Sequence, residues 1–236
     1  MAWFTRGWSF RPGDHAPHGW GRLGAFVDGV YAIAATLLVI ELRPPADAAP
    51  GQLGEGLRHL WPEYVAYAIG FTQMIAGWLQ TRRLDAWMRG IDHYATLLVL
   101  LSVGIYALTP FSTAVLATAI GDHADLATAV RLSATLLFVA LVAFAALLLY
   151  ARSSGLLRDD VQPDALTLYV RTAVFVAPLV PVLAFIVAGM APWVGLAMIV
   201  GLNLLGLLPL EVHQPPAGVV RGPRSASSRS PRRVRR

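Results

Sequence analysis

Hydrophobic residues in this chain gather into long, uninterrupted runs that short polar stretches separate. The runs lie at roughly 23 to 42, 62 to 80, 94 to 116, 130 to 150, 168 to 189 and 192 to 210. A helix rises about 1.5 Å per residue, so about 20 apolar residues cross a hydrocarbon core of about 30 Å. Barrel strands would instead alternate with period two. The pattern therefore predicts an all-α membrane protein with six transmembrane helices per subunit.

Composition points to the same class of protein. Hydrophobic residues make up 56% of the chain, charged residues make up 14%, and the mean hydropathy is +0.56. We expect residues 1–21 to form a cytoplasmic or interfacial segment and residues 22–212 to form the transmembrane domain. Residues 213–236 are rich in Pro, Ser, Gly and Arg, which predicts a disordered basic cytoplasmic tail near anionic lipid.

The basic residues, all of them arginine, are distributed unevenly between the two sides of the expected bundle. Only Arg43, Arg58 and Arg131 fall on one side. The other side holds Arg6, Arg11, Arg22, Arg82, Arg83, Arg89, Arg152, Arg158, Arg171 and the seven arginines of the tail. The positive-inside rule then predicts a multi-pass protein of the cell membrane with both termini in the cytoplasm, which requires an even number of spans.

Catalytic and cofactor-binding patterns are missing from the sequence. There is no cysteine, no Ser/His/Asp set and no phosphate-binding glycine loop, so we expect neither an enzyme nor a cofactor or bound metal. His59, His93 and His123 have no second histidine three or four residues away, as a chelating pair on a helix would need. The run from Ser102 to Tyr106 is similar to the TVGYG filter loop of known potassium channels, but its apolar surroundings predict a helix.

The first run contains an ionisable residue, Asp28. A charge in hydrocarbon is costly, so Asp28 must face a protein partner, a water-filled path or the interface. Further along the run, Ile33, Leu37 and Ile40 fall within about 60° of one another on a helix, with Thr36 beside them. From periodicity alone, this bulky stripe would simply face lipid.

A second set in the same run consists of small residues. Ala25, Gly29 and Ala32 follow i, i+4, i+7 spacing. Small residues at this spacing let another helix approach closely. We therefore expect these three residues to form a packing face.

The residues of the first run also resemble a known signature. Arg22, Phe26, Val27, Asp28 and the following GVYAIAATLLVIEL are similar to the R-x-x-x-F-S-D motif and apolar run of the transmembrane-protein-175 family, which comprises lysosomal potassium channels and their bacterial homologues. The resemblance extends over about the first 120 residues. It includes Leu60, Trp61, Pro62, Tyr67, Phe71 and Trp78 in the second run, and Leu108, Thr109, Pro110, Phe111, Ser112 and Thr113 at the end of the third.

The resemblance implies a potassium-selective channel built as a homotetramer, with the first helix of each subunit lining the pore. Ile33 matches the aliphatic constriction of the family, Thr36 matches the threonine tied to selectivity, and Leu37 and Ile40 match further apolar layers. Such a constriction blocks ions by dewetting. The implied partners are potassium ions as the permeant species, membrane lipids and further copies of this chain; nucleic acid is not expected.

The resemblance also implies that Arg22, Phe26 and Asp28 hold the first helix in place. Breaking a buried pair made by Asp28 would cost about 3 to 5 kcal/mol. Val27 replaces the serine of the motif, and Thr81 and Arg82 replace two histidines of the second helix. We therefore expect a different partner for Asp28, with an arginine as the candidate.

Three further interpretations stay open at this point. Glu41 is a possible outer acidic ring, unless the nearby Arg43 neutralises it. A secondary transporter or proton-coupled carrier is the main alternative to a channel, although the midplane positions other than Asn203 are almost wholly apolar. A non-conducting membrane scaffold is the third possibility.

Overall fold

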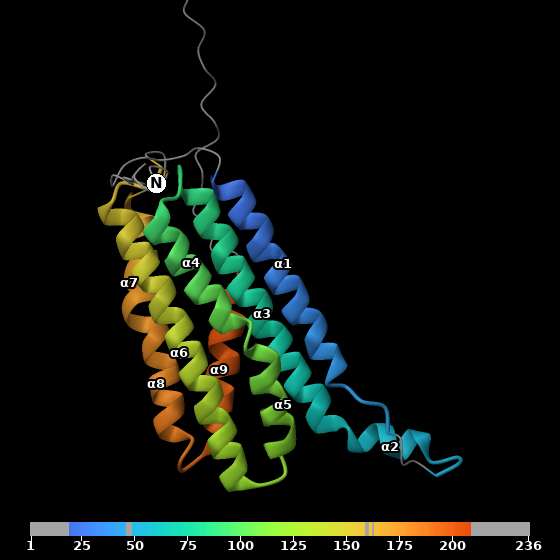
Figure 1. Ribbon diagram of the computed structural model, residues 1–236. Coiled ribbons are helices and arrows are strands. Elements are labelled where there is room, and N and C mark those ends of the chain that lie inside the picture. Colours follow the sequence, from blue (N-terminus) through green and yellow to red (C-terminus); the bar gives the residue numbers. More distant parts are fainter. Residues whose placement is uncertain (1–18, 46–48, 159–160, 162, 209–236) are drawn as a thin grey trace, which may run out of the picture.

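The computed structural model of the chain describes residues 19–45, 49–158, 161 and 163–208, and these form a bundle of helices (Figure 1). The helices are α1 (Gly19–Ile40), α2 (Leu53–His59), α3 (Trp61–Trp87), α4 (His93–Tyr106), α5 (Thr109–Ala119), α6 (His123–Ser153), α7 (Pro163–Arg171), the π-helical turn η1 (Thr172–Val176), α8 (Ala177–Val187) and α9 (Pro192–Leu207). The segments expected at 1–21 and 213–236 lie outside the described residues, apart from residues 19–21.

The prolines explain where two of the apolar runs are interrupted. The third run forms two helices, α4 and α5, rather than the single helix that we expected, with the break at Ala107 and Leu108 just before Pro110. In the fifth run, Pro178 and Pro181 follow the π-helical turn η1. Proline lacks the N–H that the carbonyl four residues earlier would bind, and π-helical turns are one way in which a helix adjusts locally.

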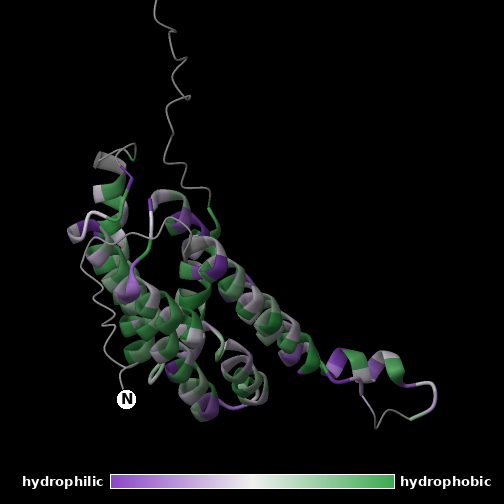
Figure 2. Cartoon of the chain, turned by 45° about the horizontal axis from the view of Figure 1, so that its top comes forward, coloured by the Kyte–Doolittle hydropathy of each residue, from purple (hydrophilic) through white to green (hydrophobic). Residues whose placement is uncertain are grey.

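Four segments are long and apolar enough to cross a membrane, judged by length and composition within the described residues. They are Gly21–Ile40, His93–Ala119, His123–Ser153 and Leu166–Val187. The helix α3 has 27 residues but carries buried Gln73 among other polar groups, and α9 is apolar but has only 16 residues. Figure 2 shows hydrophobic residues along most helices of the bundle. The fold is thus an all-helical, multi-pass membrane architecture.

The bundle is arranged around α6, which packs against α4, α5, α8 and α9. The helix α1 lies at the edge of the bundle, where it contacts α3, α4 and α5 (Figure 1). Only 22% of the apolar window of α1 is buried, against 56% for α6. One side of α1 is therefore left uncovered within the subunit.

Loops at the two ends of the bundle bring separate segments together. At the end where α1 begins, Met88 and Leu157 form an antiparallel bridge between the α3–α4 and α6–α7 connections. The Arg89 guanidinium reinforces this bridge by donating from Nε to the Gly155 carbonyl at 2.8 Å. The connections that follow α1 and α5 lie at the opposite end (Figure 1).

Candidate pore helix

The helix α1 is held in the subunit by one apolar face. Val27, Tyr31, Ala34 and Leu38 are all buried and follow i, i+4, i+7, i+11 spacing, which places them on one side of a helix. The ring of Tyr31 lies 5.8 Å from the ring of Tyr106, centroid to centroid. These contacts fix the rotation of α1 about its own axis.

The small residues do not form the packing face that we expected. Ala25 and Ala32 are exposed, and a Cβ atom added at Gly29 would meet no atom within 4 Å. Within the described subunit this prediction is wrong. The larger side chains of Tyr31 and Leu38 bury more apolar surface than alanine and glycine can, so packing follows their face.

The opposite side of α1 presents the aliphatic stripe to the outside of the subunit. Ile33 is 63% exposed, Leu37 is 44% exposed and Ile40 is 65% exposed. Thr36 is also exposed, and its hydroxyl donates to the Ile33 carbonyl at 2.7 Å. Because that hydroxyl proton is already used within the helix, the stripe is more apolar than its sequence indicates.

Asp28 bonds to the neighbouring helix α3 through an indole. Trp78 donates from Nε1 to Oδ1 of Asp28 at 2.8 Å, and the Arg82 guanidinium carbon lies 5.7 Å from the centre of the Trp78 ring. The arginine that we expected as the partner therefore contacts Trp78 and not the carboxylate. Asp28, Phe26 and Arg22 are exposed in the subunit, so the carboxylate is not a buried charge. Trp78 was named only among the residues that resemble the family, and nothing in the sequence identified it as the partner of Asp28.

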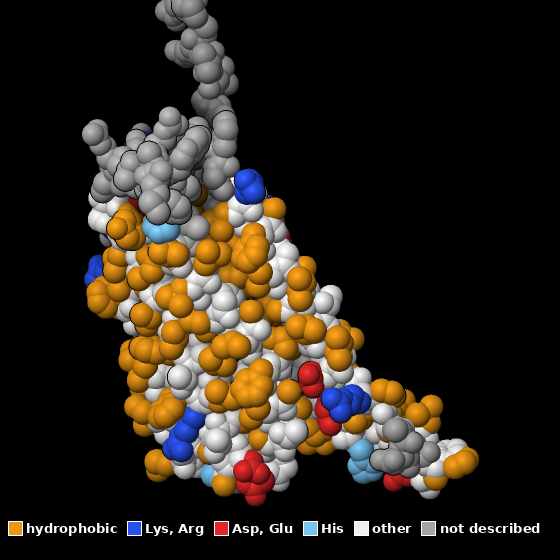
Figure 3. Space-filling model, in the orientation of Figure 1, with side chains coloured by type: hydrophobic (Ala, Val, Ile, Leu, Met, Phe, Trp, Pro, Cys, Tyr) orange, Lys and Arg blue, Asp and Glu red, His pale blue; other side chains and the backbone are white. Residues whose placement is uncertain are grey.

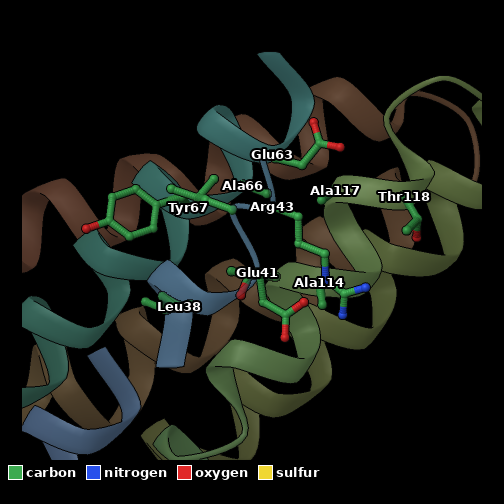
Figure 4. A pocket seen from close by; sticks show the side chains of 11 residues that line it. Leu38, Glu41, Arg43, Glu63, Ala66, Tyr67, Ala114, Ala117 and Thr118 are labelled. Atoms are coloured by element: carbon green, nitrogen blue, oxygen red, sulfur yellow. The ribbon is translucent and has the colours of Figure 1, made fainter. Parts of the chain in front are cut away.

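The end of α1 borders a pocket of about 290 Å³. Glu41 and Arg43 contribute to its lining from the segment that follows α1, and Glu63 contributes from the first turn of α3 (Figure 4). Both Glu41 and Arg43 are exposed, and no ion pair joins these two described residues. The outer acidic ring at Glu41 and its neutralisation by Arg43 therefore both stay predictions.

The segment that is similar to a potassium-channel filter loop is part of a regular helix. Residues Ser102 to Tyr106 form the last turns of α4, with Ser102 and Val103 buried. An extended backbone with carbonyls in a row is therefore absent at this segment, which confirms the prediction of a helix. Ion selection by such a filter does not apply to this stretch of the chain.

The fold and α1 together define a class: a multi-pass, all-helical membrane protein whose first helix leaves an apolar face uncovered. Figure 3 shows hydrophobic side chains over the visible face of the bundle and charged side chains toward its ends. Comparison with known proteins narrows this class. A family model described as endosomal/lysosomal potassium channel TMEM175 matches residues 22–110.

Two curated relatives agree with that match. A potassium channel of Streptomyces collinus is 31% identical over 139 residues, which cover 59% of this chain and 68% of the relative. A potassium channel of Chamaesiphon minutus is 37% identical over 102 residues, which cover 41% of this chain and 49% of the relative. The chain belongs to the TMEM175 family. Because the family consists of channels, membership confirms the expectation that this protein is not an enzyme.

Solved structures support the fold. The crystal structure of a lysosomal potassium-selective channel TMEM175 homologue from Chamaesiphon minutus aligns with a TM-score of 0.71 at 24% identity, over 81% of this chain and 97% of that one. A crystal structure of a variant of the potassium channel MtTMEM175, in complex with a nanobody fusion, aligns with a TM-score of 0.55 at 17% identity. The alignment covers 83% of this chain and 92% of that one. The resemblance of the first helix to this family is thus confirmed by sequence and by fold.

Proposed function

We propose that this protein is a potassium-selective leak channel of the cell membrane, in which four copies place their α1 helices around a central pore. Each subunit would cross the membrane six times, with α3 and α9 as spans in addition to the four segments that are long and apolar enough by themselves, and with both termini in the cytoplasm. The observation that carries the proposal is the exposed stripe of α1. A helix that packs on one face and leaves Ile33, Leu37 and Ile40 exposed is suited to line a shared axis.

The chemistry of the stripe supports a hydrophobic gate. Ile33 would form the constriction, because an apolar ring offers an ion nothing to replace its hydration shell. The Thr36 hydroxyl bonds to the Ile33 carbonyl, so its proton is not free to bind water, while its oxygen can still accept or face a cation. Conduction then depends on whether the pore is wide enough at Ile33 to stay wet.

Arg22, Phe26 and Asp28 take a positioning role in this proposal. The Asp28 carboxylate accepts a hydrogen bond from the Trp78 indole and so connects α1 to α3. This bond lies a little over one helical turn before Ile33. Glu41, at the far end of the stripe, is exposed and would add negative charge at the outer mouth. Such charge raises the local cation concentration and falls in effect with added salt.

Passive flux from liposomes tests the proposal. The purified protein, reconstituted with a potassium gradient, should release potassium without a co-substrate and without saturation. Ile33→Asn should raise the basal flux about tenfold or more, because an amide in the constriction favours water there. The matched control is Val39→Asn, on the same helix and 51% exposed but roughly 120° away from Ile33, which should leave the flux unchanged.

Three outcomes would overturn this proposal. A flux that saturates or needs a second solute would indicate a carrier, and no flux from protein that elutes as an intact oligomer would indicate a scaffold. An equal rise for Ile33→Asn and Val39→Asn would show that the stripe does not line the path. The oligomer mass, measured in detergent, separately tests the expectation of four copies.

A further inference from the structure

The exposed side of α1 carries two rows of residues that differ in size. The small row consists of Ala25, Gly29, Ala32 and Thr36, and the bulky row consists of Phe26, Val30, Ile33 and Leu37. Every member is exposed or partly exposed in the subunit. Both rows follow i, i+4, i+7, i+11 spacing, so each runs along one line of the helix. The bulky row is one residue later, which places it about 100° around the helix from the small row.

This side of α1 is unlike a helix surface that faces lipid. The exposed residues of α8, by contrast, are all large and apolar: Leu179, Val182, Leu183, Phe185 and Ile186. On α1, Asp28 is exposed about 40° around the helix from Ala32. It lies about 10 Å inside the apolar segment Gly21–Ile40. A carboxylate at that depth needs protein or water beside it, not hydrocarbon.

No helix of the described subunit covers this side. The helix α1 contacts α3, α4 and α5, and its buried residues lie on the opposite face (Figure 1). A Cβ atom added at Gly29 would meet no described atom within 4 Å. Glycine, alanine and threonine in such a row let a second helix approach closely. The cover that fits this side is therefore a helix from outside the subunit.

The two rows are complementary to each other. Large side chains of one α1 would fill the groove that small residues leave along a second α1. A contact between two different surfaces of identical chains is heterologous, and it forms a ring when the rotation closes. Each helix of a ring meets its two neighbours at about 60° for three copies, about 90° for four and about 108° for five. The separation of about 100° suits four or five copies and is too wide for three.

We propose that neighbouring copies of this chain pack α1 against α1, with the bulky row of one copy in the small row of the next. This inference rests on the proposed channel, because it describes the wall of the same pore. The line midway between the rows passes within about 20° of Ile33 and Ile40, so this packing turns both toward the axis. Leu37 lies about 60° from that line and takes part in the helix contact instead.

Native mass spectrometry of the full chain in detergent measures the assembly. Gly29→Leu fills the small row, while leucine favours a helix more than glycine does and meets no described atom of its own subunit at Cβ. We expect the concentration for half-assembly to rise at least tenfold, because the added side chain overpacks the contact. The matched control is Gly201→Leu on α9, where an added Cβ also meets nothing within 4 Å, and it should leave assembly unchanged.

A second substitution shows that the effect of Gly29→Leu comes from the facing row. Helix side chains lean toward the N-terminus, so a leucine at this position reaches the level of Phe26 in the next copy. Phe26 is 56% exposed in its own subunit, so its removal leaves the subunit core intact. Adding Phe26→Ala to Gly29→Leu should therefore restore most of the assembly. A double variant that assembles no better than Gly29→Leu alone would contradict the pairing.

Disulfide formation tests which rows face each other, since the chain has no cysteine of its own. Copies with Phe26→Cys are co-expressed with copies with Gly29→Cys and then oxidised. Covalent dimers should form in the mixture only. Identical positions on packed helices are about 8 to 10 Å apart, which is too far for a disulfide. Covalent dimers from Gly29→Cys alone would show that the small rows face each other, and this would overturn the proposal.

The outcomes separate this inference from the proposed channel. If the unaltered protein is monomeric, both fail. If it conducts potassium as an oligomer but Gly29→Leu assembles normally, only the pairing of the rows fails. Equal losses for Gly29→Leu and Gly201→Leu would likewise overturn the pairing and leave the channel intact.

Discussion

Replacing Asp28 by alanine tests whether this residue anchors α1. The substitution removes the acceptor of the Trp78 indole N–H, which lies 2.8 Å from Oδ1. A hydrogen bond to a charged group contributes about 1.5 to 3 kcal/mol to stability. The penalty of about 3 to 5 kcal/mol for breaking a buried pair does not apply, because Asp28 is exposed in the subunit. We therefore expect a loss of about 2 kcal/mol.

Thermal unfolding in detergent measures this loss. For a chain of this size, 1 kcal/mol corresponds to about 2 to 4 °C in the melting temperature, so Asp28→Ala should lower it by about 4 to 8 °C. Asp28→Asn retains an oxygen acceptor without the charge and should lose about half as much. The ratio of potassium to sodium flux should stay unchanged in both variants, because Asp28 lies off the exposed stripe.

A double-mutant cycle with Trp78→Phe isolates the hydrogen bond. Phenylalanine keeps an aromatic ring but removes the N–H donor, so the two substitutions should be strongly non-additive, with a coupling of about 1 kcal/mol or more. Additivity within about 0.3 to 0.5 kcal/mol would refute the bond as the anchor. A normal melting temperature together with altered ion preference in Asp28→Ala would also refute the reasoning, since it would assign the carboxylate to permeation.

Two further substitutions test the fold. The Asp122 carboxylate accepts hydrogen bonds from the backbone N–H groups of Asp125 and Ala124. These bonds lower the pKa of Asp122 and cap the start of α6. Asp122→Ala should lower the melting temperature at neutral pH. Because the pKa of Asp122 is depressed in the folded protein, its contribution to stability is lost as the carboxyl protonates, so the difference between the two proteins should shrink as the pH falls below about 4. Gly77→Ala would bring a Cβ atom to 2.7 Å from the Tyr106 ring and should lower the free energy of unfolding by about 1 to 3 kcal/mol. The control Gly104→Ala, where an added Cβ atom meets no atom within 4 Å, should be neutral or stabilising. Equal melting temperatures for the two variants would contradict this reasoning.

The pattern of apolar runs was enough to predict where most helices lie. Its failures concern features that depend on neighbouring helices. The helix α3 continues to Trp87, beyond the end of its apolar run, and Arg83 near that end donates to the Gly206 and Leu208 carbonyls at the end of α9. These partners are more than a hundred residues apart in the sequence. A hydropathy pattern contains no information about such a contact.

The faces of α1 show a second limit. Ala25, Gly29 and Ala32 have the same spacing as Val27, Tyr31 and Ala34, and the two sets differ only in rotation about the helix. Periodicity therefore identifies both as possible faces and does not choose between them. The contact of Tyr31 with Tyr106 decides the choice, and it depends on where α4 lies.

The contacts of α1 determine how this helix would move in the proposed channel. The hydrogen bond from Trp78 holds α1 to the subunit at Asp28. Along the helix axis, Asp28 lies about 8 Å from Ile33 and about 18 Å from Ile40. A tilt of α1 by about 5° with Asp28 as the pivot would shift Ile40 by about 1.6 Å but Ile33 by only about 0.7 Å. The end near Ile40 borders the pocket that Arg43 and Glu63 line, and a displacement at this end would have the longest lever. A tilt of α1 would therefore change the width of the Ile40 layer more than that of the Ile33 layer.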